Sequence, residues 1–124
     1  MVEVPALDHD ALMLSKYGVK VSPNGRLERR IVANLIAHLA AAGFAVVGVY
    51  DGEEESPAAD AKAAMELIFN LDESYVRFTK DGAMRGVYLV LGNGIDIVSD
   101  YSYAEGDADG FDAAMQAFDA EAFA

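Results

Sequence analysis

Hydrophobic residues recur with a helical period in the segment "RLERRIVANLIAHLAAAGF", residues 26–44. A stripe of this period predicts an amphipathic helix whose apolar face packs on a core. Gly43 follows the stripe and predicts the helix end, because glycine readily adopts the left-handed conformation that closes many helices. The stripe consists of Ile31, Leu35, His38 or Leu39, and Ala42, with Val32 and Ile36 beside it.

A short apolar run, "FAVVGVY", comes next and predicts an interior strand. The acidic "DGEEE" after it predicts a loop. Ser56 and Pro57 then predict the N-cap and first turn of a second helix, which we expect to run to about Asn70. Its predicted buried residues are Ala61, Met65 and Ile68.

Three further strands are predicted in "SYVRFTK", "RGVYLVL" and "IDIVSDYSY". Asp81-Gly82 joins the first pair and Asn93-Gly94 joins the second pair, and both dipeptides favour two-residue hairpin turns. These turns predict an antiparallel three-strand meander. A last helix is predicted from about residue 110 to 121, with Phe111, Ala114, Met115, Phe118 and Ala122 on its buried stripe.

The predicted element order is α-β-α-β-β-β-α. It indicates an α+β fold with two layers, in which helices lie mainly on one face of a mixed four-stranded sheet. The first strand, the second helix and the second strand are expected to form a right-handed crossover unit. Residues 26–124 form a single domain in this interpretation, and residues 1–25 are expected to be partly mobile.

The two hairpin turns also predict which side chains share a face of the sheet. We assign one face to the helices and expect the other to be a tyrosine-rich apolar surface rimmed by acids. Exposed patches of that kind are typical of protein interfaces. The alternative is that the N-terminal 25 residues fold over it. The helix face holds Val76, Phe78, Val87, Leu89, Leu91 and Val98, and the other holds Tyr75, Arg77, Met84, Tyr88, Val90, Ile95, Ile97 and Tyr101, with Tyr103 beyond.

Charge is distributed unevenly along the chain, whose formal net charge is −12. Residues 1–50 carry five bases and four acids, whereas residues 51–124 carry four bases and 17 acids, with no base after Arg85. Such a field repels nucleic acid and anionic membrane and attracts basic protein surfaces. The alternative interpretation is that the acids only keep the protein dispersed.

Composition excludes several classes of protein. The chain has no cysteine, which rules out disulfides, thiolate metal sites and cysteine nucleophiles. No apolar run approaches the roughly 20 residues of a membrane-spanning helix. The first residues carry acids where a secretory signal carries bases, so we expect a cytoplasmic location.

The stretch "EGDADGFDAAMQ", residues 105–116, resembles a calcium loop in spacing. Asp107, Asp109 and Gly110 occupy the third, fifth and sixth positions, but the twelfth is Gln116 instead of a bidentate glutamate. Helix capping explains the same residues, with Asp109 as N-cap and Asp112 in the positive first turn. Weak binding of a divalent ion by residues 105–116 stays open.

No catalytic constellation emerges from the remaining polar residues. "LGNGID" lacks the third glycine of a phosphate-binding loop and fits a hairpin turn. His38 is expected at the helix boundary with a hydrogen-bond partner, and His9 in "LDHD" to be solvated. We predict no catalytic residue, no metal and no cofactor, with a metal-dependent enzyme that uses a carboxylate pair as a remaining alternative.

The run "GVYLVLGNGIDIVSDYSY" followed by "DGFDAAMQAF" resembles stretches of small acidic proteins carried by bacterial phages and plasmids. The resemblance covers about residues 27–120 and contains no motif of known chemical role. Proteins of this setting are similar in kind to anti-CRISPR and anti-restriction proteins. The resemblance implies binding to a nuclease complex and occlusion of its DNA-binding surface, in some cases by mimicry of DNA charge.

Together these observations predict a non-enzymatic interaction module that docks onto a basic, nucleic-acid-binding surface of a partner protein. We expect no direct binding to nucleic acid or membrane. The alternatives are a homodimer or a ligand-binding domain that uses the tyrosine face. The predicted partner-binding residues are Glu53, Glu54, Glu55, Tyr75, Tyr88, Asp100, Tyr101, Tyr103, Glu105, Asp107 and Asp109.

Overall fold

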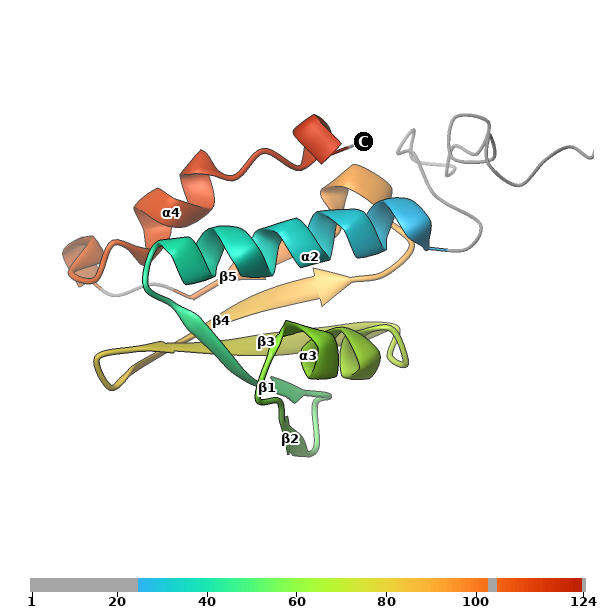
Figure 1. Cartoon of the computed structure of the whole chain (residues 1–124), viewed down its shortest axis with the longest axis horizontal. Coiled ribbons are helices and arrows are strands. Elements are labelled where there is room, and N and C mark those ends of the chain that lie inside the picture. Colours follow the sequence, from blue (N-terminus) through green and yellow to red (C-terminus); the bar gives the residue numbers. More distant parts are fainter. Residues whose placement is uncertain (1–24, 103–104, 124) are drawn as a thin grey trace, which may run out of the picture.

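The computed structural model describes residues 25–102 and 105–123 (Figure 1). Tyr103, His9 and the N-terminal segment that was predicted to be mobile lie outside the described residues. Short 3₁₀ turns occupy Gly94–Asp96, Glu105–Asp107 and Ala120–Phe123. The main elements are α2 (Arg26–Ala41), β1 (Ala45–Tyr50), β2 (Glu55–Pro57), α3 (Ala61–Ile68), β3 (Glu73–Lys80), β4 (Ala83–Val90), β5 (Val98–Tyr101) and α4 (Phe111–Ala117).

The sheet has five strands in the order β2-β1-β3-β4-β5, and every neighbouring pair is antiparallel. The α+β class is therefore confirmed, and the predicted meander is present as β3-β4-β5. The predicted mixed sheet with a right-handed crossover is wrong. Strand β2 reverses the chain beside β1 before α3 begins, so β3 returns antiparallel to β1. Because β2 is a three-residue edge strand, it tolerates Pro57, which lacks an N–H.

The predicted start of the second helix is also wrong. Ser56 and Pro57 belong to β2, and the N–H of Ala58 extends the ladder by donating to Val47 O at 2.9 Å. Asp60 is the actual N-cap of α3, and its carboxylate accepts the N–H of Ala63 at 2.9 Å. The register of the helix changes with its start. Ile68 is buried as predicted, whereas Ala64 is buried and Ala61 is exposed.

Helix α2 has the predicted extent and the predicted end. Gly43 has a φ of 98°, and its N–H donates to Ala40 O at 3.0 Å. The N–H of Phe44 donates to Leu39 O at 2.8 Å, so the two bonds form a Schellman motif. His38 lies at the helix boundary as predicted, and its Nε2 donates to Ala114 O at 2.7 Å.

The two predicted hairpins differ in outcome. Asp81 and Gly82 both have positive φ and connect β3 to β4, which confirms the first turn. The second turn is wrong, because residues 91–97 form a longer loop that contains the 3₁₀ turn Gly94–Asp96. Glu28, only 4% exposed on α2, holds this loop. Its Oε2 accepts the N–H groups of Gly92 and Gly94 at 2.7 and 3.0 Å.

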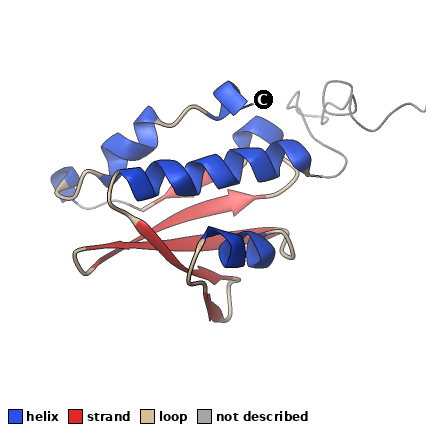
Figure 2. Cartoon of the chain, in the orientation of Figure 1, coloured by secondary structure: helices blue, strands red, loops and turns tan. Residues whose placement is uncertain are grey.

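The hydrophobic core lies between one face of the sheet and the helices, which Figure 2 shows in blue beside the red strands. Three phenylalanines occupy one end of this core. The ring of Phe111 lies 4.9 Å from that of Phe44 and 6.4 Å from that of Phe78, centroid to centroid. Because Phe111 is the first residue of α4, this contact fixes the C-terminal helix to the sheet.

Replacing Phe111 with alanine should therefore be severe. The ring is fully buried, so the Phe111→Ala variant loses its transfer free energy and leaves a cavity. We expect the free energy of unfolding to fall by about 3–5 kcal/mol in a urea titration. Met84→Ala is the control, because this side chain is 50% exposed and should change stability by less than about 0.5 kcal/mol. Equal losses in the two variants would contradict the assignment of Phe111 to the core.

Candidate functional site

The face of the sheet opposite the helices carries one row of side chains that crosses all five strands. Cross-strand pairing joins Tyr50 to Glu55 and Tyr75, and joins Tyr88 to Tyr75 and Asp100. We call Glu55, Tyr50, Tyr75, Tyr88 and Asp100 the tyrosine row. It places three aromatic rings side by side with a carboxylate at each end.

The rings of the tyrosine row are packed and anchored. Tyr75 and Tyr88 stack with centroids 4.6 Å apart and planes 20° apart, and Tyr50 lies 6.4 Å from Tyr75. The hydroxyl of Tyr88 donates to Glu73 Oε1 at 2.7 Å, and that of Tyr50 donates to Gly52 O at 2.9 Å. These contacts hold the rings in position, while 44% of Tyr75 remains exposed.

A second row beside the tyrosines is built around Arg77. Its cross-strand partners are two glycines, Gly48 on β1 and Gly86 on β4. Arg77 leans toward Gly48, where its Nε lies 3.3 Å from Glu55 Oε1 and its guanidinium lies 5.4 Å from the Tyr50 ring centroid. Gly48 makes room for this ion pair, because a Cβ there would lie 2.6 Å from Glu55 Oε2.

The other side of Arg77 is hollow. The nearest neighbouring atom to a Cβ built on Gly86 is Val76 O at 3.7 Å, and Gly86 lines a depression of about 350 Å³. We call this depression the Gly86 hollow. Its lining consists of Tyr50, Tyr75, Arg77, Met84, Arg85, Gly86, Asp100, Tyr101 and Ser102.

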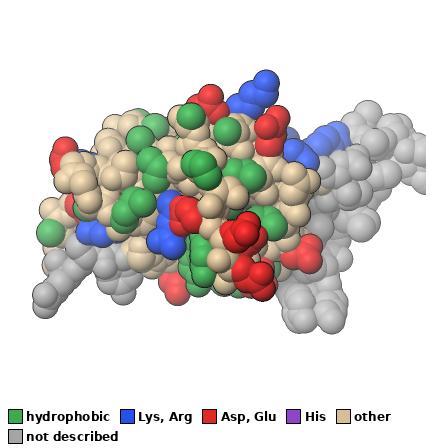
Figure 3. Space-filling view, turned by 90° about the horizontal axis from the view of Figure 1, so that it is seen from below, with side chains coloured by type: hydrophobic (Ala, Val, Ile, Leu, Met, Phe, Trp, Pro, Cys, Tyr) green, Lys and Arg blue, Asp and Glu red, His purple; other side chains and the backbone are tan. Residues whose placement is uncertain are grey.

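We call the sheet face opposite α2, α3 and α4 the open face. Acidic residues gather at one end of it, in the turn between β1 and β2 and at the start of β2. Glu53, Glu54 and Glu55 are all exposed there. Figure 3, seen from below Figure 1, shows acidic and hydrophobic side chains side by side with basic groups among them. Asp51 Oδ1 accepts the N–H groups of Glu54 and Glu53 at 2.7 and 2.8 Å, which holds the pKa of Asp51 below its usual value.

Tyr101 borders the Gly86 hollow, but its ring packs on the helix side of the sheet, so its predicted side is wrong. A bulge in the pairing of β4 with β5 places Tyr101 opposite Val87, on the helix side of the sheet. Its ring packs against Phe111 at 6.1 Å, and its hydroxyl donates to Asp112 Oδ1 at 2.5 Å and accepts from Gln116 Nε2 at 2.9 Å. Ile97, also predicted on the open face, is fully buried.

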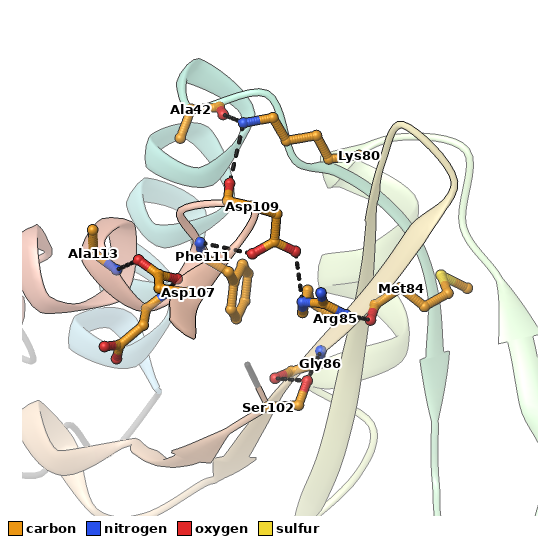
Figure 4. A network of polar contacts seen from close by, with 11 residues as sticks. Ala42, Lys80, Met84, Arg85, Gly86, Ser102, Asp107, Asp109, Phe111 and Ala113 are labelled. Carbon is orange, nitrogen blue, oxygen red and sulfur yellow. Dashed lines mark hydrogen bonds and ion pairs between the residues drawn. The ribbon is translucent and has the colours of Figure 1, made fainter. Parts of the chain in front are cut away.

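The acids of the calcium-like stretch have internal partners. Asp109 Oδ2 lies 2.7 Å from Arg85 Nε, and Lys80 Nζ donates to the carbonyls of Ala42 and Asp109 at 3.2 and 3.3 Å (Figure 4). This network ties the start of α4 to the end of α2 and to the β3–β4 hairpin. The side chain of Asp109 is only 13% exposed as a result.

Capping of α4 also differs in detail from the prediction. The N-cap is Gly110, with a φ of 80°, and not Asp109. Asp107 supplies the cap from three residues earlier, because its two carboxylate oxygens accept the N–H groups of Asp112 and Ala113 at 2.7 and 3.1 Å. Glu105 begins the preceding 3₁₀ turn. Asp107 and Asp109 therefore serve the fold, and neither lies on the open face.

Neither a metal site nor a relative directs the interpretation elsewhere. Over residues 25–102 and 105–123, no group of three or more His, Asp or Glu side chains is arranged to hold a metal ion. No helix in the same ranges has the length and apolar character needed to cross a membrane. Comparisons with models of protein families, with curated proteins and with solved structures found no significant match. The resemblance to phage and plasmid proteins stays a prediction.

Sequence reasoning missed Tyr50 and Glu73 as members of this surface. Tyr50 ends the strand "FAVVGVY", and its place beside Tyr75 depends on the antiparallel pairing of β1 with β3. Alternation along the chain indicates the face of Tyr50 only once that pairing is known. Of the predicted partner-binding residues, the structure brings Glu55, Tyr75, Tyr88 and Asp100 together in one row.

The hydrogen bond from Tyr88 to Glu73 raises the pKa of Tyr88 above its usual value, and desolvation adds to the rise. In Glu73→Ala this pKa should fall back toward that of free tyrosine, as followed by NMR of the labelled tyrosine ring. A raised folded-state pKa stabilises the fold below the unfolded pKa, and this contribution is lost as the pH rises through the folded pKa. Glu54→Ala, an exposed acid not bonded to Tyr88, is the control. An unchanged pKa in Glu73→Ala would contradict the assigned cause.

A methyl group at Gly48 should break the ion pair between Arg77 and Glu55. In Gly48→Ala the new Cβ collides with Glu55 Oε2, so we expect the Arg77 Nε–H signal to move in NMR spectra and the free energy of unfolding to fall by about 1 kcal/mol. The matched control is Gly86→Ala, where a Cβ meets nothing closer than 3.7 Å. An unmoved Arg77 signal in Gly48→Ala would refute this role for Gly48.

Proposed function

We propose that this chain is a non-enzymatic protein-binding module that uses the open sheet face to dock on a basic surface of a partner protein. The observation that carries the proposal is the tyrosine row, whose three packed rings lie between two carboxylates on the face that α2, α3 and α4 leave free. Tyr75 and Met84 are the exposed large hydrophobic side chains of the described chain, and both belong to this face.

Rigid tyrosines suit binding because they bury a large area at a small cost in side-chain entropy. The stack of Tyr75 on Tyr88 and the bond from Tyr88 to Glu73 fix the rings before a partner arrives. Aromatic residues of this kind dominate the energetics of many interfaces. The tyrosine row would therefore supply affinity, and its pre-organisation would limit the entropy lost on binding.

The carboxylates of the open face favour a partner with a basic surface. The open face carries the carboxylates of Glu55, Glu73 and Asp100 beside the guanidinium of Arg77, with Arg85 at the hollow, and Asp51, Glu53 and Glu54 lie at its end. Complementary charge raises the association rate and makes binding sensitive to salt. Basic protein surfaces often bind nucleic acid, so the module would act as an inhibitor that occupies such a surface in place of phosphates.

A capture experiment tests this function. Wild-type protein and Tyr75→Ala serve as baits for a cell lysate at low and at high salt, with Lys62→Ala, altered on exposed α3, as the control bait. We expect capture of a nucleic-acid-binding protein by the wild type and by Lys62→Ala at low salt, with loss at high salt. Removal of a central aromatic should weaken capture about tenfold or more. An excess of the wild type should lower the affinity of the captured protein for its nucleic acid.

Each part of the proposal has its own contrary result. Equal capture by Tyr75→Ala would place the interface elsewhere. An unchanged affinity of the captured protein for nucleic acid would contradict the inhibitor role. A dimer detected by light scattering in the wild type and absent in Tyr75→Ala would assign the open face to self-association, which the net charge of −12 on each copy opposes.

A further inference from the structure

We infer that the Gly86 hollow receives an arginine side chain of the partner, between the Tyr75 ring and the Asp100 carboxylate. This inference rests on the proposed function for the class of partner and names the group that the surface recognises. The hollow extends from Tyr50 and Tyr75 to Asp100, beside the most exposed ring of the tyrosine row.

The open face repeats one arrangement at its two ends. On the β1–β2 side, a glycine (Gly48) borders an arginine that lies over Tyr50 and pairs with Glu55. On the β4–β5 side, Gly86 borders the hollow, with Tyr88 and Asp100 in the positions equivalent to Tyr50 and Glu55. Arg77 fills the first half. Strand pairing gives the second half the same glycine, tyrosine and carboxylate, but no arginine of the described residues lies over its tyrosine. The hollow there is lined by Gly86, Asp100 and Tyr75, and Tyr88 does not line it.

The carboxylate in the second half is presented toward a ligand. Asp100 is exposed, and its Oδ1 accepts the N–H of Tyr101 at 2.8 Å, so the backbone anchors it. Ser102 is also fixed, because its Oγ accepts the N–H of Gly86 at 2.7 Å. The charge of Arg77 is directed to Glu55 at the opposite end. Arg85, which also lines the hollow, is paired with Asp109 at 2.7 Å. Both arginines of the lining thus have carboxylate partners, and Asp100 is the carboxylate that the hollow offers to a ligand.

Arginine fits these groups better than other ligands of similar size. A planar guanidinium can stack on a tyrosine ring and bind a carboxylate through two donors at once, whereas a lysine ammonium is a strongly hydrated point charge. An anionic aromatic ligand would meet Asp100 and the net negative charge of the chain. The contact of Arg77 with Tyr50 shows that this surface already accommodates a guanidinium against a tyrosine.

The test uses two peptides of equal length and charge, one with arginines and one with lysines, titrated into the full chain at low salt and followed by amide NMR shifts. We expect the arginine peptide to bind about two- to fivefold more tightly, as a cation–π contact at an exposed site implies. The largest shifts should fall on Gly86 and Ser102. Asp100→Asn should weaken the arginine peptide by a similar factor.

Two further variants distinguish binding of the peptide in the hollow from general attraction between opposite charges. Glu66→Gln removes one exposed charge from α3, as Asp100→Asn removes one from β5, and should leave the affinity unchanged. Gly86→Val fills the hollow, and its Cβ would meet only ordinary contacts at 3.7 and 3.9 Å, so it should bind the arginine peptide more weakly. Thermal melting and the amide spectrum check its fold, and Asp100→Asn decides the question if that fold is altered.

The inference is overturned if the two peptides bind equally with shifts spread over the acidic surface, or if Asp100→Asn and Glu66→Gln behave alike. These results are independent of the capture experiment. If Tyr75→Ala abolishes capture but the arginine peptide causes no specific shifts at Gly86 and Ser102, the proposed function stands and the arginine site is refuted. If the arginine peptide binds in the hollow but wild type and Tyr75→Ala capture the partner equally, the arginine site stands and the proposed interface is wrong.

Discussion

Burial of one face of the antiparallel sheet by α2, α3 and α4 is the constraint on which the rest of the described structure depends. It requires Val76, Phe78 and Val87 to point toward the helices, and alternation then places Tyr75, Arg77 and Tyr88 on the opposite face. Different physical requirements therefore select the side chains of the two faces. Close packing selects the side chains of the helix face, whereas the open face is left to side chains that meet solvent or a partner.

The C-terminal helix maintains this one-sided arrangement through contacts that span the sequence. Phe111 enters the core beside Phe44 and Phe78, and Asp109 binds Arg85 just before it. Lys80 adds bonds to the carbonyls at the end of α2 and at Asp109. Much of the negative charge near residues 105–112 is thereby used inside the fold. The acid count of the sequence therefore overstates the number of carboxylates that are free of internal partners.

Local signals explain what the sequence predicts well. The end of α2 at Gly43 and the Asp81–Gly82 hairpin each depend on a few adjacent residues. The hairpin fixes the register of β3 with β4, and alternation along β3 then places Phe78 and Arg77 on opposite faces of the sheet. The features that the sequence did not predict depend on contacts between residues far apart in the chain. Glu28 on α2 accepts hydrogen bonds from Gly92 and Gly94 in the loop after β4. These residues lie 64 and 66 positions from Glu28, so no short-range sequence pattern predicts the bonds.

The same reasoning explains why only part of the candidate site was predicted. Tyr75 and Tyr88 follow from one local turn, but Tyr50 joins them only through the pairing of β1 with β3, which depends on the short strand β2. Tyr101 was misplaced because the bulge in β5 inverts its side. A site that spans five strands thus combines residues whose positions are fixed locally with residues fixed by the whole sheet. Its two ends have nonetheless the same composition, glycine, tyrosine and carboxylate, and an arginine of the chain itself satisfies one of them. The two halves thus share their strand pairing and differ in the arginine, which only the Glu55 half holds over its tyrosine.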